Sequence, residues 1–397
     1  MKAARTVFIK ELRETLRDRR SLLVAFLMPL LLMPLVLLVA AATAHYRERS
    51  DREETLTVGL INTAAMPGLP EALGAATNLQ PRSFALREDA EAAMQDQSVR
   101  AALLVPSDSA GAFQENRAAA VEILYDGAND KSRLAHERLK RVLDEVTKKE
   151  QLRRLETRGL DRSLLEPMDV RSTNLAPPHR KGGFLLGTLL PYFVVLWTVV
   201  GGMNAAFDMC AGEKERGTME TLLVSSASRR QIIAGKLGAV WVMSVAAALF
   251  SLIGMVLAVS GGFRSMVQLG GEQMDVSYGS VALALVTVIP LALMMSALLL
   301  MISTFARSQK EAQAYSVPIT TVVTVAAMLS IVLGQENSIA LGAVPVLNTA
   351  LAMKQVLGGM VDIPFLAVSL ASSVVYALIT LKLAGAMFER EAVLFRT

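Results

Sequence analysis

Two long apolar segments on either side of a short charged one most constrain how this chain can fold. Phe184–Phe207 and Leu237–Ser260 each exceed twenty residues without a charged side chain. A helix needs about 20 apolar residues to cross a hydrocarbon core about 30 Å thick, so both segments are predicted to span a membrane. The segment between them, Gly212–Lys236, reads GEKERGTMETLLVSSASRRQIIAGK and contains five Lys/Arg residues. Because basic loops stay on the cytoplasmic side, we expect this segment in the cytoplasm.

The remaining apolar residues gather in similar blocks. Hydrophobic residues make up 53% of the chain, and they are concentrated in discrete runs rather than spread at the period of a soluble helix or strand. The predicted fold class is therefore an α-helical polytopic membrane protein of six transmembrane helices, with an α/β extracytoplasmic domain inserted between spans one and two. The six predicted spans are Leu22–Ala44, Phe184–Phe207, Leu237–Ser260, Gly279–Ser303, Ala312–Leu333 and Phe365–Phe388.

Basic residues also predict the orientation of the chain. Seven Lys/Arg residues precede the first span, Arg307 and Lys310 follow the fourth, and Arg390 and Arg396 follow the sixth. We therefore expect a multi-pass protein of the cytoplasmic (inner) membrane with both termini in the cytoplasm. The predicted parts are a cytoplasmic interfacial helix (1–21), the first span (22–44), the extracytoplasmic domain (45–181), spans two to six (182–388) and a cytoplasmic tail (389–397). Within 182–388 lie the charged loop (208–236) and an outer segment (344–359).

The N-terminal segment reads as an amphipathic helix. One face is lined by Phe8, Leu12, Thr15 and Leu16, while Lys10, Arg13, Arg17 and Arg20 lie elsewhere. This pattern is typical of a helix lying on anionic lipid headgroups. The apolar run that follows is about 23 residues long, beyond the roughly 7–15 of a secretory signal. We expect it to be retained as a membrane anchor.

The polar region between the first two spans is predicted to be a small α/β module. Its basic and acidic residues nearly balance, which argues against nucleic acid as a partner. It contains no cysteine, so no disulfide is expected. Three strands are predicted at Leu56–Ile61, Ala101–Val105 and Ala120–Tyr125, and two helices at Ala85–Gln95 and Asn129–Arg158.

The charged loop carries the local signals of a short helix and a turn. Thr218 is predicted to cap that helix, with Glu220 in its first turn, where an acid complements the helix dipole. Ser228–Gln231 is a capping-box pattern that opens the next span. The plain alternative is a solvated loop whose charges only fix topology. The predicted apolar face of the short helix comprises Met219, Leu222 and Leu223.

The residues of this loop also resemble a known family. GEKERGTMETLLVSSASRRQIIAGK is similar to the loop after the second span in permeases of the ABC-2 class of ABC transporters, particularly the NatB-type sodium-efflux branch. Lys10–Leu23 and Val344–Gly359 are similar to other parts of the same family. The resemblance implies that the loop forms the helix that couples the permease to its ATPase, through Glu213, Lys214, Glu215, Arg216, Gly217, Thr218, Met219, Glu220, Leu222 and Leu223.

The same resemblance implies the function and the partners. It implies the permease subunit of an ATP-driven exporter, with two copies of a separate ATPase, a second and identical permease protomer, and membrane lipid around them. No nucleotide cofactor site is expected in this chain, because Gly235-Lys236-Leu237 lacks the earlier glycine and the hydroxyl of a phosphate-binding loop. No catalytic site or metal is expected either, because nothing resembles a nucleophile triad and the three histidines are not at metal-ligand spacing. ATP and Mg²⁺ would bind the partner ATPase. The branch implies Na⁺ or a related cation as substrate, and lipid, drug or peptide export stays an alternative.

Val346–Leu357 is too short to cross a membrane. By resemblance it belongs to a re-entrant segment near the outer exit, with Pro345, Asn348 and Lys354 as its notable residues; the alternative is an exposed connecting helix. The lone Cys210 is expected to be a small buried residue.

The predicted spans contain no acidic residue, although a cation crossing a membrane usually needs a carboxylate partner. This makes a stand-alone ion-coupled carrier unfavourable. A membrane-anchored sensor or scaffold with a ligand-binding outer domain is the alternative from another class. If Na⁺ does pass, neutral oxygens must bind it, although such hydroxyls commonly bond their own helix. The candidates are Thr188, Thr198, Asn204, Ser296, Ser303, Thr304, Thr320, Thr321 and Thr324.

Overall fold

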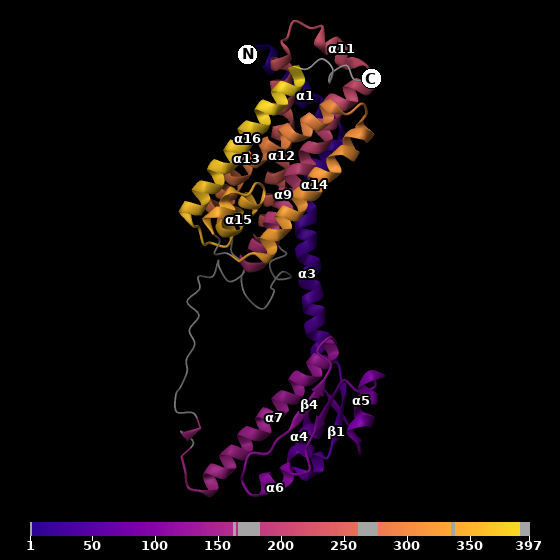
Figure 1. Cartoon of the computed structure of the whole chain (residues 1–397), viewed down its shortest axis with the longest axis vertical. Coiled ribbons are helices and arrows are strands. Elements are labelled where there is room, and N and C mark those ends of the chain that lie inside the picture. The colour runs from indigo at the N-terminus through magenta and orange to yellow at the C-terminus, as the bar shows by residue number, and fades with distance from the viewer. Residues whose placement is uncertain (1, 162–163, 166–182, 261–276, 335–337, 390–397) are drawn as a thin grey trace. The chain divides into compact units, whose positions relative to one another are not determined.

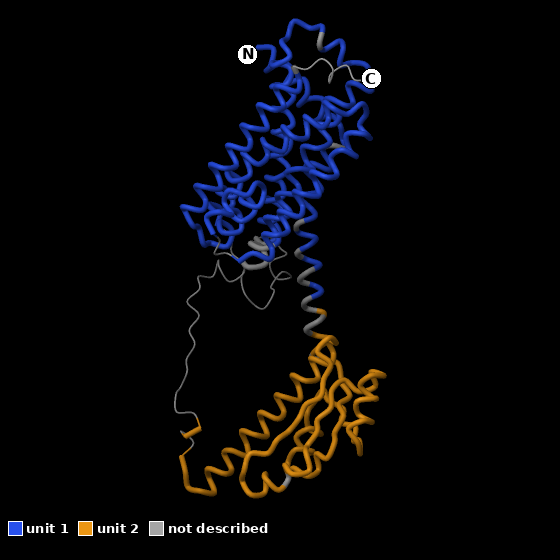
Figure 2. The backbone as a smooth tube through the Cα atoms, in the orientation of Figure 1, with its two compact units in different colours: residues 1–43, 175–397 blue, residues 44–174 orange. Residues whose placement is uncertain are grey.

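The computed structural model describes residues 2–161, 164–165, 183–260, 277–334 and 338–389 (Figure 1). They form two compact units, shown in separate colours in Figure 2: residues 1–43 with 175–397, and residues 44–174. We call the first the helical unit and the second the inserted domain.

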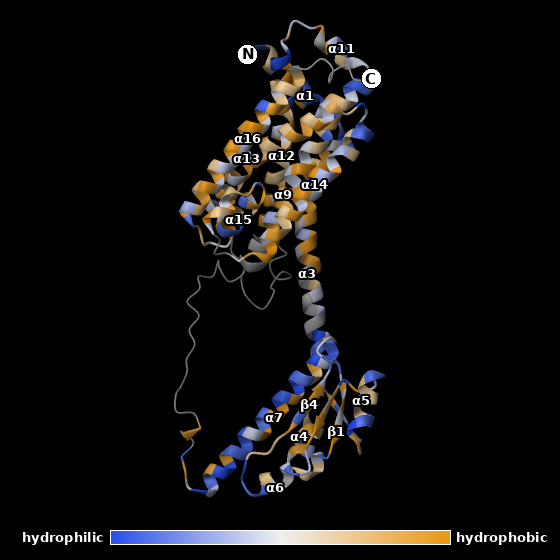
Figure 3. Cartoon of the chain, viewed as in Figure 1, coloured by the Kyte–Doolittle hydropathy of each residue, from blue (hydrophilic) through white to orange (hydrophobic). Residues whose placement is uncertain are grey.

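Five helices in the described residues are long and apolar enough to cross a membrane, and apolar residues dominate them in Figure 3. They contain the predicted spans two to six, because a long uncharged apolar run can satisfy its backbone in lipid only as a helix. The chain is thus a helical polytopic membrane protein. The helices are α9 (Gly183–Phe207), α12 (Arg229–Ser260), α13 (Tyr278–Phe305), α14 (Gln309–Val332) and α16 (Ile363–Glu389).

The first predicted span, Leu22–Ala44, differs from the other five. In the described part of the chain this region gives only a shorter apolar helix, Leu23–Val36. The backbone passes from α2 (Arg19–Leu22) through a π-helical turn (Leu23–Leu27) into α3 (Met28–Glu53). The helix continues beyond the predicted end of the span because its last two turns, although charged, are made of residues that favour a helix.

Close contact between α9 and α12 depends on two adjacent glycines. A Cβ atom at Gly201 would lie 2.2 Å from Cβ of Ala247, and one at Gly202 would lie 2.1 Å from Oγ of Ser244. Small residues let helices in membranes approach closely and gain dispersion contacts. This pair therefore fixes the spacing of the two helices joined by the charged loop.

The N-terminal helix α1 (Lys2–Arg17) packs on α12. Its buried residues are Val7, Glu11 and Thr15. Phe8 and Leu12 pack partly against the main apolar core, whereas Leu16 is 43% exposed. Of the predicted face, Thr15 is therefore buried and Leu16 is exposed, and the buried stripe also contains the carboxylate of Glu11.

The inserted domain has a four-stranded sheet in the order β2-β1-β3-β4. β1 is parallel to β2 and to β3, and β3 is antiparallel to β4. The domain core lies between this sheet and the helices, around Leu56, Val58, Leu103 and Leu139. The strands are β1 (Leu56–Ile61), β2 (Leu79–Phe84), β3 (Ala101–Leu104) and β4 (Glu122–Tyr125), and the helices are α4 (Leu69–Ala75), α5 (Arg87–Gln95), α6 (Ser109–Gln114) and α7 (Asp130–Thr157).

The three predicted strands and both predicted helices of this domain are confirmed, with ends shifted by at most two residues. Asn129 caps α7 by accepting hydrogen bonds from the backbone N–H groups of Lys131 and Ser132. β2 was not predicted, because half of its segment LQPRSF is polar and it contains a proline. A strand at the edge of a sheet tolerates both features.

Candidate functional site

The charged loop begins as a continuation of α9. A π-helical turn (Asp208–Gly212) leads into α10 (Glu213–Glu215), and after Gly217 the chain forms α11 (Thr218–Leu223). Gly217 has a φ of +69°, a conformation that favours glycine because a Cβ atom would be strained there. This residue redirects the chain between the two short helices.

The predicted capping of α11 by Thr218 is wrong. Gly217 occupies the cap position, and the Thr218 hydroxyl donates instead to the carbonyl oxygen of Glu213. Of the two hydrogen bonds of a capping box, one is present at the start of α12: the Gln231 side chain accepts from the backbone N–H of Ser228 at 3.1 Å.

Lys236 lies at the centre of a buried ion cluster at the base of this loop. Its ammonium group donates to Oε2 of Glu213 at 2.7 Å, to Oε1 of Glu11 at 2.9 Å and to the carbonyl oxygen of Met209 at 2.7 Å. The Lys236 side chain is 0% exposed, that of Glu11 2% and that of Glu213 6%. Charges buried so fully are stable only when they are paired and hydrogen-bonded.

Lys10 balances the charge of this cluster. Its ammonium group lies 3.1 Å from Oε1 of Glu213 and 3.3 Å from Oε1 of Glu11. Partial burial lowers the pKa of Lys10, but Glu11 and Glu213 outweigh that effect and hold its pKa above the usual range. Lys10 also pairs with Glu14, whose side chain is 58% exposed, at 3.3 Å. The two cations thus meet two buried carboxylates and a third at the surface, and we call Lys10, Glu11, Glu213 and Lys236 the ion cluster. Its members come from α1, α10 and α12.

Lys214 ties the loop to the end of another span. Its ammonium group donates to the carbonyl oxygens of Thr304 and Ala306, the latter at 3.4 Å. These carbonyls lie at the C-terminal end of α13, where the helix dipole favours a cation. The loop is therefore anchored to α13 as well as to α1 and α12.

A more exposed network joins the loop to the start of α14. Arg216 donates to Oδ1 of Asp208 at 2.9 Å, and the Gln309 amide donates to the same oxygen at 2.9 Å. The backbone N–H of Gln309 donates to Oε2 of Glu215 at 3.2 Å. The side chains of Arg216 and Asp208 are each 54% exposed, so their pair is accessible to a partner.

The residues that the family resemblance assigned to coupling fall into two groups. Glu213 and Met219 are buried, Glu213 in the ion cluster and Met219 in the apolar core. Neither side chain is therefore available for direct contact with a partner protein, which corrects the role expected for these two residues. Leu222 is half-buried and Lys214 is engaged with α13. The Leu223 side chain lies outside the described set. The exposed members are Glu215, Arg216, Gly217, Thr218 and Glu220.

The sequence analysis missed three contributors. Lys236 was taken only as one of the basic residues that set topology, and Glu11 was given no role. A charged side chain beside an apolar run must find a partner if it is buried, and this rule was the available signal. Val224 follows α11 and is 88% exposed. Val224, Arg216 and Glu220 are all exposed on this loop, so one apolar and two charged side chains are accessible there.

The segment between the last two spans forms α15 (Leu347–Leu357), and all eleven of its residues are buried. The alternative of an exposed connecting helix is therefore wrong. Lys354 donates to the carbonyl oxygens of Ser330 and Leu333 at 2.7 and 2.5 Å, at the C-terminal end of α14. Asn348 donates to the carbonyl oxygen of Ser369 and to two serine hydroxyls of α16. Pro345 is exposed just before the helix.

The hydroxyl groups considered as cation ligands mostly bond within their own helices. Ser303 instead donates to the carbonyl oxygen of Phe207 at 3.4 Å, across to α9. Cys210 is buried, as predicted. The hydroxyls that donate to a carbonyl four residues earlier are those of Thr198, Ser296, Thr304, Thr320 and Thr321.

Comparison with known proteins identifies the kind of molecule that carries this site. The family described as ABC-2 family transporter protein matches residues 19–386. The chain is 27% identical over 361 residues to the ABC transporter permease protein NatB of Bacillus subtilis (strain 168), covering 90% of each chain. No solved structure matches. Because the family match covers most of the sequence and all five long apolar helices, this chain belongs to the ABC-2 family of transporter permeases, whose membrane domain has no catalytic site.

Proposed function

We propose that this permease is the membrane subunit of an ATP-driven exporter, and that the loop 208–224 receives the movement of a separate ATPase subunit. The observation that carries the proposal is the ion cluster. It joins the base of this loop, at Glu213, to α1 through Glu11 and to α12 through Lys236. The family membership supports an ATPase partner, since the chain itself is a permease.

The surface proposed for docking is the exposed part of the loop. Val224 would enter an apolar groove of the ATPase, while Glu215, Arg216 and Glu220 would surround it with charge. This arrangement, an apolar centre with a polar rim, is common in protein interfaces. Glu213 takes no part in the contact and acts behind it.

Movement of this surface would be passed on because the ion cluster resists separation. The bonds from Lys236 to Glu213 and Glu11 are short, at 2.7 and 2.9 Å, and buried. Separating α1, α10 or α12 from the other two would leave a buried charge without its partner, at a cost of several kcal/mol. A shift of α10 would therefore move α1 and α12 with it. Coupling of this kind needs an element with two arrangements that ATP binding favours unequally.

The remaining parts of the proposal follow the family resemblance. The loop and both termini would lie in the cytoplasm, the inserted domain would lie outside, α1 would rest on the lipid headgroups, and α15 would form a re-entrant segment near the outer exit. With a sixth span supplied by residues 22–44, two identical permease chains and two ATPase chains would complete the exporter. ATP and Mg²⁺ would bind only the ATPase.

For the substrate, the resemblance to the sodium-efflux branch favours Na⁺ or a related cation, with lipid, drug or peptide as the alternative. ATPase activity of the reconstituted complex, measured with each candidate substrate including Na⁺, would separate these alternatives.

The docking surface is tested by Glu215→Ala combined with Arg216→Ala. We expect this double variant to lose most of the copurifying ATPase or to uncouple its hydrolysis from export, while the permease keeps its thermal stability. The matched control is Arg87→Ala with Glu91→Ala, an ion pair of similar exposure in the inserted domain. Normal ATPase binding and normal transport by the first variant would exclude this loop as the docking site. Failure of any ATP-binding chain to copurify with the unaltered permease would favour the sensor alternative.

A further inference from the structure

The inserted domain contains a cavity at one edge of its sheet. β1 ends at Ile61 and β3 ends at Leu104, and these neighbouring parallel strands end at the same edge. After β1 the chain continues to β2, at one edge of the strand order, and after β3 it continues to β4, at the opposite edge. Open α/β sheets bind their ligands at such a divergence, outside the carboxyl ends of the strands.

One side chain holds the two strand ends together. Asn62, directly after β1, has a φ of +56°, in the left-handed region that asparagine enters more readily than most residues. Its side-chain amide donates to the carbonyl oxygen of Val105, directly after β3, at 3.0 Å. This hydrogen bond holds the segments after β1 and β3 together in the absence of a ligand.

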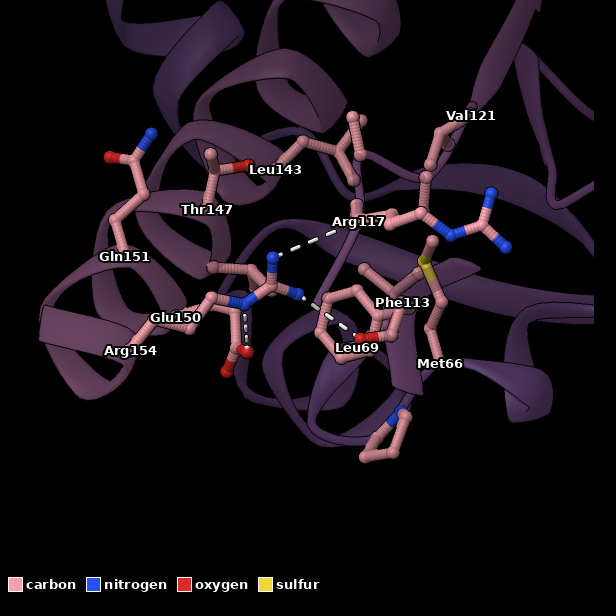
Figure 4. A pocket seen from close by; sticks show the side chains of 14 residues that line it. Met66, Leu69, Phe113, Arg117, Val121, Leu143, Thr147, Glu150, Gln151 and Arg154 are labelled. Atoms are coloured by element: carbon pink, nitrogen blue, oxygen red, sulfur yellow. Dashed lines mark hydrogen bonds and ion pairs between the residues drawn. The ribbon is translucent and has the colours of Figure 1, made fainter. Parts of the chain in front are cut away.

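The cavity that opens there has a volume of about 340 Å³, within the range of about 300–1,000 Å³ typical of small-molecule sites. Its walls come from the segment after β1, from α6 with the loop that follows it, and from the C-terminal half of α7 (Figure 4). The apolar part of the lining includes Met66, Leu69, Phe113, Leu143 and Val146.

The wall opposite α7 is held in place by Arg154. Its guanidinium pairs with Glu150 at 2.7 Å, donates to the carbonyl oxygen of Phe113 at 3.2 Å and lies 5.1 Å above the Phe113 ring (Figure 4). Hydrogen bonds from Arg153 and Arg154 lower the pKa of Glu150 to about 2, so this carboxylate stays charged and its charge is matched within the domain. These contacts build the cavity without help from a ligand.

The polar groups at the rim differ from this locked pair. Thr147 and Gln151 are exposed one turn apart on α7, and Arg117 lies across from them. Arg117 is 68% exposed and pairs with Glu115, which is 63% exposed. A pair so open contributes little to stability, so a ligand carboxylate can replace Glu115 on the guanidinium.

We propose that this cavity binds a small amphipathic organic anion. Its apolar body lies against Phe113, Leu143 and Val146, and its carboxylate or similar group reaches Arg117 at the rim. The inserted domain then acts as a receptor for an organic solute, which is a function separate from docking of the ATPase. The proposal depends on the geometry of this domain alone and does not require the coupling role of the loop.

The test uses the full-length permease in lipid nanodiscs, with 2-naphthoate as the probe and saturation-transfer NMR as the readout. We expect saturable binding that is absent from empty nanodiscs. Thr147→Trp fills the cavity from an exposed position and should weaken binding at least tenfold, whereas Lys148→Trp, at the next exposed position outside the cavity, should leave it unchanged. The absence of saturable binding, or equal binding to both variants, would overturn the proposal.

A second variant tests the rim. Arg117→Ala should weaken binding of 2-naphthoate at least fivefold while changing that of the neutral 2-naphthamide less than twofold. Equal losses for the two probes would refute the anion assignment. Neither measurement involves ATP or the ATPase, so failure here is distinguishable from failure of the exporter proposal.

Discussion

Replacing Lys236 with methionine removes the cation at the centre of the ion cluster while keeping a long apolar side chain. The variant leaves Glu11 and Glu213, which are 2% and 6% exposed, facing each other. Lys10 offsets only part of that repulsion, because its side chain is 42% exposed and its distances to the carboxylates are longer, at 3.3 and 3.1 Å. Removing one partner of a buried pair costs about 3–5 kcal/mol, and we expect Lys236→Met to lower the free energy of unfolding by that amount.

The chain offers its own probe for this measurement. Cys210 is the only cysteine and is buried, so a fluorogenic maleimide should react with it only when the helical unit opens. The melting temperature read from that reaction should fall by several degrees in Lys236→Met. Lys310→Met serves as the control, because Lys310 is exposed at the start of α14, outside the predicted span, and exposed substitutions usually change stability by less than about 0.5 kcal/mol.

A double variant shows whether charge balance is the cause. Lys236→Met with Glu213→Gln leaves Glu11 as the one buried carboxylate beside Lys10, which also pairs with the exposed Glu14, and should recover part of the lost stability. If Lys236→Met melts at the temperature of the unaltered protein, or if Glu213→Gln recovers none of the loss, the ion cluster does not hold these elements together and the proposed route of coupling fails.

Three further predictions follow from other parts of the molecule. Gly201→Ala places a Cβ atom 2.2 Å from that of Ala247 and should lower the free energy of unfolding by about 1–3 kcal/mol through overpacking. Gly385→Ala, with open space around it, should leave the melting temperature unchanged in the same assay. Equal effects of the two variants would contradict the close packing of α9 and α12. The pKa of Glu150 is lowered from 4.5 to about 2, so its stabilising effect is complete at pH 7 and is lost as the pH falls through its folded pKa. Between pH 7 and pH 3 the inserted domain should lose about 2 kcal/mol of stability, measured by hydrogen exchange. The Glu150→Gln variant should show no such loss. In a Cys210→Ala background, a membrane-impermeant maleimide added to intact cells should label Ser107→Cys and not Ser226→Cys; labelling of Ser226→Cys from outside would reverse the proposed orientation.

Local composition alone determined the helices of the membrane region. An apolar run of the length of α9 or α13 must form a spanning helix whatever surrounds it, since each backbone group must bond within the same segment. The strands β1 and β3 and the helix α7 were predictable for a similar reason, because their periodicity and caps are written in consecutive residues. β2 was not, since Pro81 and its polar neighbours carry no strand signal and pair only because β1 is available beside them.

Tertiary structure decided which charges became buried. Glu11 and Lys236 are 225 positions apart in the sequence, and nothing near either residue announces the other. Their pairing depends on α1 packing against α12, where Gly235 leaves space for Val7. Tertiary packing also buried Glu213 and Met219 while Glu215 and Glu220 stayed exposed, a division that the loop sequence does not show. The length of an apolar run depends only on consecutive residues, so it can be read directly from the sequence. Ion pairing depends on which distant helices come into contact, and this is decided only when the helices pack.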